Sequence, residues 1–210
     1  MAMKPQLVQL LEAMKAQNLK PMHELSPADA RKQMADSAKA RSTTLIEVGN
    51  IEDRSIPGPA RSIPLRIYKP KVTNGAVGAL VYFHGGGHVI GDLDSHDSVC
   101  RAICSDAKIL VMSVDYRMGP ESKFPAAVDD SYAATKWLFE NADLMGVRAD
   151  KIGVGGDSAG GNLALVTSLL ARDKDDVVSL AIQMLVYPVM DYTGGTPTYT
   201  HFGRGYGPLT

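Results

Sequence analysis

Short, nearly continuous apolar runs alternate with amphipathic stretches through most of the chain. Runs of this kind are typical of parallel strands that are buried on both faces of a sheet. The pattern predicts strands over residues 45–48, 63–68, 79–83, 109–114, 152–154 and 180–187. Between them, helical periodicity predicts helices around residues 99–104, 125–138 and 159–172. This alternation predicts an α/β fold with a mostly parallel sheet and right-handed crossovers.

Residues 1–40 differ in character from the rest of the chain. Apolar residues recur there at helical spacing: Leu7, Leu10, Leu11 and Met14. Ser26 followed by Pro27 predicts an N-cap and the first position of a second helix. We therefore divide the chain into an N-terminal helical segment, residues 1–40, and an α/β core, residues 41–210. The Gly-, Pro- and Thr-rich tail from Thr193 is predicted to be a loop.

Composition narrows the class of protein further. Of the 210 residues, 45% are apolar and 21% are charged, and the formal net charge is −1. We therefore expect a globular cytoplasmic protein without nucleic acid as a partner. Neither a signal peptide nor an apolar run of membrane-spanning length is evident in the sequence. Cys100 and Cys104 have no neighbouring ligands at metal-site spacing and are predicted to be buried thiols.

The segment Gly156–Gly160, G-D-S-A-G, follows a predicted strand and precedes a predicted helix. This G-x-S-x-G pattern predicts a nucleophile elbow, with Ser158 on a sharp turn above the sheet. Gly156 and Gly160 are expected there because a Cβ at either position would clash. The Ala159 N–H is expected to point at a developing oxyanion, whereas Asp157, beside the nucleophile, cannot also orient a base. The alternative is a phosphate or dinucleotide loop, but the last glycine of that fingerprint and a P-loop lysine are both absent.

A second glycine-rich segment, His84–Gly87, follows the predicted strand 79–83. Three consecutive glycines allow a backbone to turn its N–H groups toward a substrate, and we assign Gly86 and Gly87 as oxyanion donors. One such donor is typically worth about 10²–10³ in rate. His84 and Gly85 are expected to support the loop, with the His84 side chain hydrogen-bonding it into shape. The alternative is a flexible turn without chemical use.

Together these segments resemble the hormone-sensitive-lipase-like branch of the α/β-hydrolases, the esterase family with an HGGG loop and a GDSAG elbow. Asp115–Glu121 is similar to that family's D-Y-R-L-A-P-E run, and Phe124–Ala127 to its F-P-A-A segment. Tyr187–Asp191 is similar to the segment after its sixth strand, and residues 1–40 match its cap-forming segment. The resemblance implies hydrolysis of short- to medium-chain carboxylic esters, with a small-molecule ester as substrate and neither metal nor cofactor. It also implies that two copies can pair through an edge strand.

Other residues near these motifs are open to more than one interpretation. Arg117 and Glu121 are predicted to form a charge pair that holds the loop after the fourth strand, in preference to contacting substrate. His88 stands where the family often has an apolar or aromatic residue. It either lines the acyl or alcohol pocket or faces solvent from the loop.

The catalytic acid and base are not evident in this sequence. In this fold the chain order is Ser, then Asp or Glu, then His. The acids of Asp173–Asp176 belong to the far end of the helix that follows Ser158. Asp191 and His201 satisfy the order, but the family places its acid and histidine after two further strands. We therefore expect the chain to lack about the last third of such an esterase, and to be nearly inactive and poorly soluble in isolation.

Two classes of function follow from these observations. The first is a carboxylic ester hydrolase that forms an acyl-enzyme through Ser158. The alternative is a non-catalytic, receptor-like protein that uses the same fold to bind a ligand. Reactivity of the serine separates the two. The sequence does not identify the natural ester.

Overall fold

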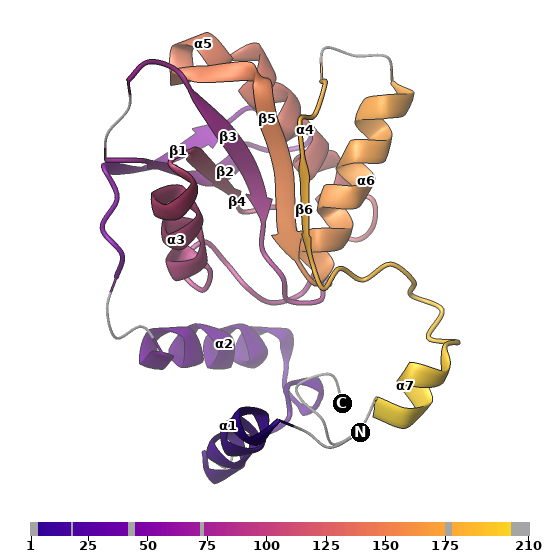
Figure 1. Cartoon of the computed structure of the whole chain (residues 1–210). Helices are drawn as coiled ribbons and strands as arrows, with labels where there is room; N and C mark the ends of the chain where they lie inside the picture. The colour runs from indigo at the N-terminus through magenta and orange to yellow at the C-terminus, as the bar shows by residue number, and fades with distance from the viewer. Residues whose placement is uncertain (1–3, 18, 42–44, 72–73, 175–177, 203–210) are drawn as a thin grey trace.

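A computed structural model describes residues 4–17, 19–41, 45–71, 74–174 and 178–202. Six strands form one sheet in the order β1-β2-β4-β3-β5-β6 (Figure 1). The strands are β1 (Asn50–Ile56), β2 (Ile63–Lys69), β3 (Val77–Phe83), β4 (Leu110–Val114), β5 (Val147–Asp157) and β6 (Gln183–Val186). β4, β3, β5 and β6 are parallel neighbours, whereas β2 is antiparallel to both β1 and β4. The predicted mostly parallel α/β sheet is confirmed.

Helices cover both faces of this sheet (Figure 1). The helical elements are α1 (Pro5–Ala16), η1 (Met22–Glu24), α2 (Pro27–Arg41), α3 (Asp97–Ala107), α4 (Ala126–Glu140), α5 (Ala142–Met145), α6 (Ala159–Asp173) and α7 (Pro197–Phe202). α3 packs on one face, and α4 and α6 pack on the other. None of the described helices combines the length and apolar character needed to cross a bilayer.

The central strand β3 contributes to both layers of the core. Val81 and Phe83 pack in the cluster with α4 and α6, whereas Leu80 and Tyr82 pack in the cluster with α3. Successive side chains of a strand point to opposite faces, so a strand covered on both sides is apolar throughout. The α3 cluster also contains two thiols, Cys100 and Cys104, which are free and buried as predicted.

The first strand of the sheet was wrongly predicted. Residues 45–48 are not a strand, and Leu45 and Ile46 are exposed. The strand begins instead at Asn50, where the pattern is mixed because β1 is an edge strand with a solvated face. Its Asp53 carboxylate pairs with Arg66 of β2 at 2.6 Å. Cross-strand charge pairs of this kind stabilise β1 without an apolar signal in the sequence.

The tail contains a further difference from the prediction. α7 occupies part of the segment predicted to be a loop from Thr193, with Pro197 as its first residue and Thr196 before it. Threonine followed by proline is a favourable helix start, and the Gly-rich surroundings obscured it. Residues 203–210 of this tail lie outside the described residues, as do the side chains of Leu10 and Met14.

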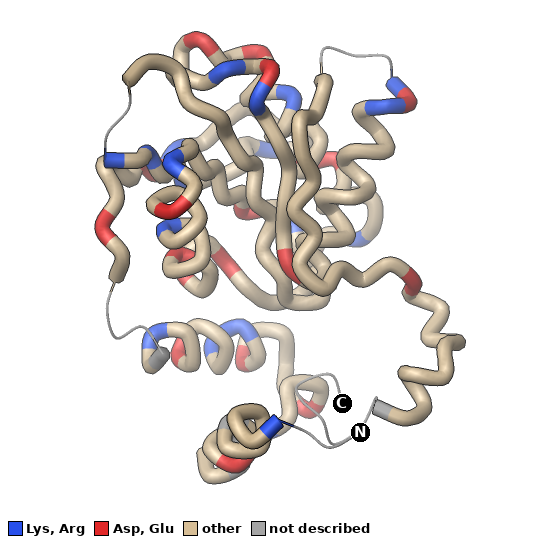
Figure 2. The backbone as a smooth tube through the Cα atoms, viewed as in Figure 1, with Lys and Arg blue, Asp and Glu red and all other residues tan. Residues whose placement is uncertain are grey.

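The N-terminal helices lie at the end of the sheet where β3, β5 and β6 finish (Figure 1). Loops that follow parallel strands gather at this end, and in open α/β sheets ligands bind there. A ligand site is therefore expected at the carboxyl ends of β3 and β5. Acidic and basic residues are interspersed along the backbone (Figure 2).

Candidate active site

Ser158 occupies a strained turn between β5 and α6. Its backbone has φ 51° and ψ −118°, a conformation that costs an L-residue on the order of 1–3 kcal/mol. The turn is held by bonds to the end of β6 and to the segment after it: Ser158 N–H donates to Val186 O at 2.9 Å, and Ser158 O accepts from Val189 N–H at 3.2 Å. Strain supported on both sides in this way is typical of a functional turn.

Two glycines allow this turn to pack against the end of β3. A Cβ on Gly156 would lie 2.3 Å from the carbonyl oxygen of Phe83, and one on Gly160 would lie 1.9 Å from it. Both separations are far below any real contact, so no larger residue fits at either position. The close approach places the start of α6 directly beside the loop that follows β3.

The loop His84–Gly87 has two peptide groups whose orientation is fixed. Gly86 and Gly87 have φ +124° and +61°. His84 Nδ1 lies 2.8 Å from Gly85 O, and Gly86 O accepts from Val89 N–H at 3.0 Å. In a planar trans peptide the C=O and the next N–H point in opposite directions. Holding these carbonyls therefore aims the Gly86 and Gly87 N–H groups to the other side of the loop.

Three backbone N–H groups remain available at this place. The N–H groups of Gly86, Gly87 and Ala159 donate to no acceptor among the residues that the structure describes. Ala159 is the first residue of α6, so its N–H is one of the unsatisfied donors at the positive end of that helix. Free N–H groups beside a partly buried serine hydroxyl can stabilise the charge of a tetrahedral oxyanion.

The Asp157 carboxylate ties the elbow to the glycine loop. Its Oδ1 accepts from the Gly85 N–H at 3.0 Å and from Tyr82 OH at 2.7 Å, and it lies 3.4 Å from His96 Nε2. Burial alone would raise the pKa of Asp157, but the bonds from His96, Tyr82 and Gly85 outweigh it and the pKa is lowered. The carboxylate is therefore charged at neutral pH, and it anchors the loop through the Gly85 N–H.

His84 supports the loop from inside. Its imidazole is buried and stacks on Tyr116, with ring centroids 4.5 Å apart. Burial lowers the pKa of His84 to about 4, so the ring is neutral. Because Gly85 O can only accept, Nδ1 carries the proton. The lone pair on Nε2 then has no partner among the described residues.

A second polar contact links the two sides of the site. His88 follows Gly87, has φ +61°, and its Nε2 lies 2.7 Å from Tyr192 OH. Tyr192 belongs to the segment after β6, whose Val189 N–H holds Ser158 O. The pair therefore bridges the glycine loop and the segment after β6. Burial lowers the pKa of His88, which keeps this ring neutral as well.

The charge pair predicted between Arg117 and Glu121 is wrong. Arg117 instead makes a two-pronged contact with Asp130 of α4, at 2.8 and 2.7 Å. Asp130 is 1% exposed, and a buried carboxylate needs a hydrogen-bonded cation. Glu121 pairs with Arg31 of α2 at 2.7 Å.

The five histidines of the chain all have partners other than Ser158. His84, His88 and His96 are engaged as described above, and His23 lies 3.9 Å from Glu24. His201 Nδ1 lies 2.7 Å from Pro197 O within α7, which Figure 1 shows well apart from the end of β5.

Asp191, which satisfies the triad order together with His201, is also engaged elsewhere. The Asp191 carboxylate accepts from the N–H and the hydroxyl of Thr193. An Asp191–His201 pair is therefore not assembled at Ser158, and the described arrangement contains no base for this hydroxyl.

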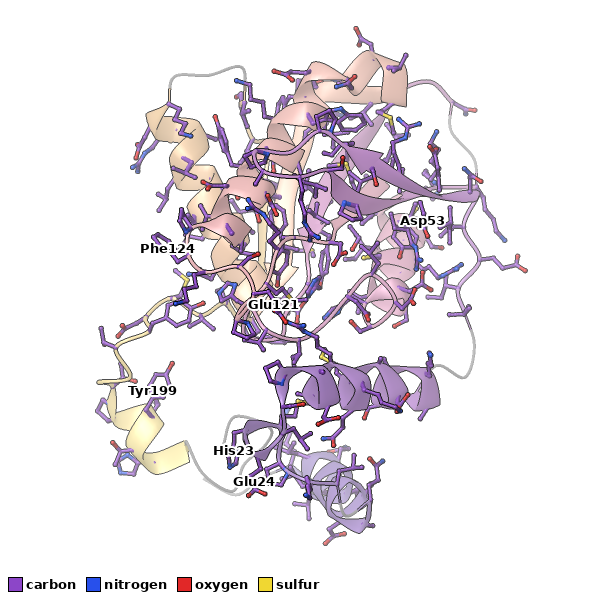
Figure 3. All side chains as sticks on the ribbon, turned by 180° about the vertical axis from the view of Figure 1, so that it is seen from behind. His23, Glu24, Asp53, Glu121, Phe124 and Tyr199 are labelled. Carbon is purple, nitrogen blue, oxygen red and sulfur yellow. The ribbon has the colours of Figure 1, made fainter. Side chains whose placement is uncertain are left out.

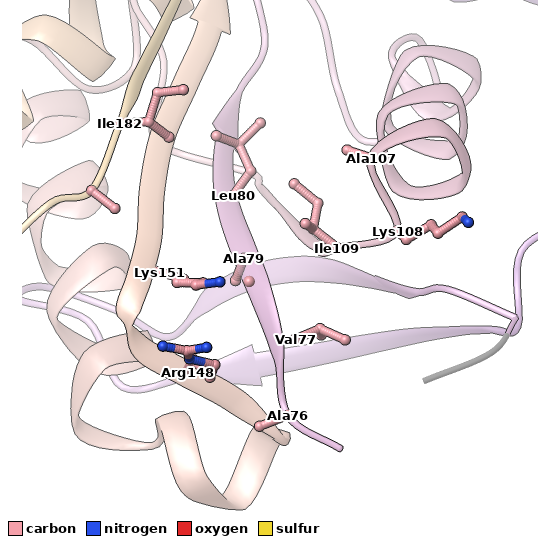
Figure 4. A pocket seen from close by; sticks show the side chains of 12 residues that line it. Ala76, Val77, Ala79, Leu80, Ala107, Lys108, Ile109, Arg148, Lys151 and Ile182 are labelled. Atoms are coloured by element: carbon pink, nitrogen blue, oxygen red, sulfur yellow. The ribbon is translucent and has the colours of Figure 1, made fainter. Parts of the chain in front are cut away.

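A separate groove of 440 Å³ lies at the opposite end of the sheet (Figure 4). It is lined by the first residues of β3 and by Lys108, Arg148 and Lys151. The strained serine and the free N–H groups are at the other ends of these strands, so this groove is not the candidate site.

Comparison with known proteins agrees with this geometry. A family profile described as the alpha/beta hydrolase fold matches residues 80–207. Carboxylic ester hydrolase LipN of Mycobacterium tuberculosis is 48% identical over 161 residues, which cover 75% of this chain and 43% of the relative. Ethyl acetate hydrolase of Pseudomonas putida is 36% identical over 213 residues, covering 98% of this chain and 67% of the relative.

Solved structures give the same result. The esterase of Pyrobaculum calidifontis superposes with a TM-score of 0.91 at 37% identity, covering 100% of this chain and 68% of that chain. An ester hydrolase from the Lake Arreo metagenome superposes with a TM-score of 0.92 at 35% identity, covering 98% of this chain and 66% of that chain. This chain spans only 43% of LipN and 67% of the ethyl acetate hydrolase.

Proposed function

The chain belongs to the α/β-hydrolase family, in its hormone-sensitive-lipase-like esterase branch, and on that basis we propose that it provides the nucleophile and oxyanion donors of a carboxylic ester hydrolase. Ser158 is the nucleophile, and the N–H groups of Gly86, Gly87 and Ala159 bind the oxyanion. One observation carries the proposal: a strained serine stands beside three N–H groups that have no acceptor in the described part of the chain.

The proposed reaction begins with attack of Ser158 Oγ on the acyl carbon of the ester. A base removes the hydroxyl proton as the new C–O bond forms, and the carbonyl oxygen becomes an oxyanion held by the three N–H groups. Collapse of this intermediate breaks the bond to the alcohol oxygen, which leaves with the proton. Water then attacks the acyl-enzyme by the same route and releases the acid.

The base is the part of this reaction that the described residues do not place. Each of the five histidines has another partner, so an imidazole must approach Ser158 from outside this arrangement. A soluble imidazole can take this role in a test. Without any base, the oxyanion donors alone still leave catalysis about 10³–10⁴ above water, far below that of a complete triad.

The relatives support a proposal for the substrate class. A curated relative is named an ethyl acetate hydrolase, and we propose short- to medium-chain esters as substrates here. The helices of residues 1–40 lie at the end of the sheet that carries Ser158 (Figure 1), and we propose that they form a cap over the site. Neither step of the proposed reaction requires a metal or a cofactor.

An acetylation assay tests the proposal. The chain is mixed with p-nitrophenyl acetate in imidazole buffer, and acetyl transfer to Ser158 is followed by peptide mass spectrometry. Ser158→Ala is the control for reaction of imidazole with the ester and for acetylation elsewhere. We expect imidazole-dependent acetylation of Ser158. No acetylation of Ser158, together with reversible ligand binding, would favour the receptor-like alternative.

A further inference from the structure

Arg31 of α2 contacts two loops that flank the glycine loop. Its Nε donates to Val89 O at 2.7 Å, and its Nη2 donates to Gly119 O at 2.8 Å. The same guanidinium forms a two-pronged pair with Glu121, at 2.9 and 2.7 Å. Figure 3 shows Glu121 at the end of the sheet that faces α2. One side chain of the N-terminal segment thus bonds to backbone of both loops.

Backbone hydrogen bonds connect these carbonyl contacts with the oxyanion donors. Val89, whose carbonyl Arg31 holds, donates its own N–H to Gly86 O at 3.0 Å. Gly86 O belongs to the same peptide group as the Gly87 N–H, so its position sets the direction of that donor. Gly119 N–H donates in turn to His88 O at 2.8 Å. Arg31 therefore fixes both residues that follow Gly87.

The ion pair with Glu121 is a less important part of this contact. The Glu121 side chain is 60% exposed, and exposed ion pairs contribute little to stability. The carbonyl bonds require the planar fork of a guanidinium, which presents several donors in fixed directions. A lysine at position 31 would keep the charge but replace the fixed fork by a single ammonium on a flexible stem.

We propose that Arg31 is a positioning residue for the oxyanion loop, acting through Val89 O and Gly119 O and not through its ion pair. The inference rests on the proposed function, because it assigns Arg31 a part in orienting the Gly87 N–H. It also gives residues 1–40 a role beyond covering the site: α2 holds the loop that receives the oxyanion.

Four variants in the acetylation assay test this inference. Arg31→Met keeps the aliphatic stem and removes every donor, and Arg31→Lys keeps the charge. Glu121→Gln removes the ion pair and leaves the carbonyl bonds. Lys32→Met is the matched control, since Lys32 forms an exposed pair with Asp36 on the same helix. Thermal unfolding establishes that each variant is folded, and amide hydrogen exchange reports on Val89 and Ile90.

The expected result is a loss in the maximal acetylation rate of Ser158. Arg31→Met should slow it at least tenfold at saturating ester, up to the roughly 10²–10³ of a lost oxyanion donor. Arg31→Lys should fall between Arg31→Met and wild type, and exchange at Val89 should accelerate in both. Glu121→Gln and Lys32→Met should match wild type.

Two outcomes would overturn the inference. The first is a folded Arg31→Met or Arg31→Lys that acetylates Ser158 at the wild-type rate. The second is a Glu121→Gln variant as slow as Arg31→Met, which would assign the effect to the ion pair. Absence of Ser158 acetylation in the wild-type chain is a different result, because it refutes the proposed function itself.

Discussion

Alanine substitutions at Gly86 and Gly87 are expected to have very different effects, although the two glycines are adjacent. A Cβ on Gly86 would lie 2.0 Å from Ile90 O, whereas one on Gly87 would have no atom within 4 Å. To reach even 3.0 Å, the Gly86 Cβ and Ile90 O must separate by about 1 Å. This movement breaks the bonds from Val89 and Ile90 that hold Gly86 O.

The magnitude follows from this displacement. A misplacement of about 1 Å in a catalytic group can cost on the order of 10²-fold in rate, or about 2.7 kcal/mol of barrier. Gly86→Ala should therefore slow Ser158 acetylation about 10²-fold. Gly87→Ala retains the loop at φ +61° and adds about 1–2 kcal/mol of backbone strain, mainly as lost stability. Its acetylation rate should fall by less than about tenfold.

The acetylation assay at several ester concentrations, with unfolding followed in parallel, measures both effects. Equal rates for the two variants would refute the reasoning, as would a folded Gly86→Ala with the wild-type rate. In either case the orientation of the Gly86 carbonyl would not control the oxyanion donors.

Three further predictions concern the surroundings of the site. His88→Phe removes the bond to Tyr192, and we expect a change in the relative rates of Ser158 acylation by p-nitrophenyl acetate and p-nitrophenyl hexanoate; unchanged selectivity would contradict a pocket role. The pKa of Asp157 is lowered, so its charge stabilises the fold at pH values above the ordinary aspartate pKa of about 3.9. Urea denaturation should show a stability difference between wild type and Asp157→Asn that is constant above about pH 5. This difference should begin to shrink near pH 4 and vanish below the native pKa of Asp157. A difference that vanishes already at neutral pH would contradict this prediction. Asp130→Asn leaves Arg117 without its buried partner and should cost about 3–5 kcal/mol by urea denaturation; a loss under 1 kcal/mol would show that the pair is dispensable.

The central sheet and the two glycine segments were predictable because their signals are local. Strands buried on both faces are apolar throughout, and each glycine segment is a contiguous motif, although the atom that excludes a Cβ at Gly156 and Gly160 is Phe83 O, far away in the chain. β1 was misplaced because an edge strand with a solvated face carries polar residues such as Asp53, which leave no apolar pattern. The same limit hid the true partner of Arg117, since Asp130 is buried within α4.

The supports of the site were not predictable from the motifs. Arg31 reaches carbonyl groups 58 and 88 positions away in the chain, and Tyr82 reaches Asp157 across 75 positions. His96 looks like any polar residue before a helix, yet its ring faces the Asp157 carboxylate. Such contacts exist only once the ends of β3 and β5 are brought together. The motifs identified the reacting atoms, and the structure was needed to identify what holds them.

Labelling with a fluorophosphonate tests the nucleophilic role of Ser158 most directly. The chain is treated with the probe in imidazole buffer beside the Pseudomonas putida ethyl acetate hydrolase, and the adducts are mapped by peptide mass spectrometry. Our account predicts one adduct on Ser158 that is absent from Ser158→Ala. Labelling of the relative without any adduct on Ser158 of this chain would contradict it.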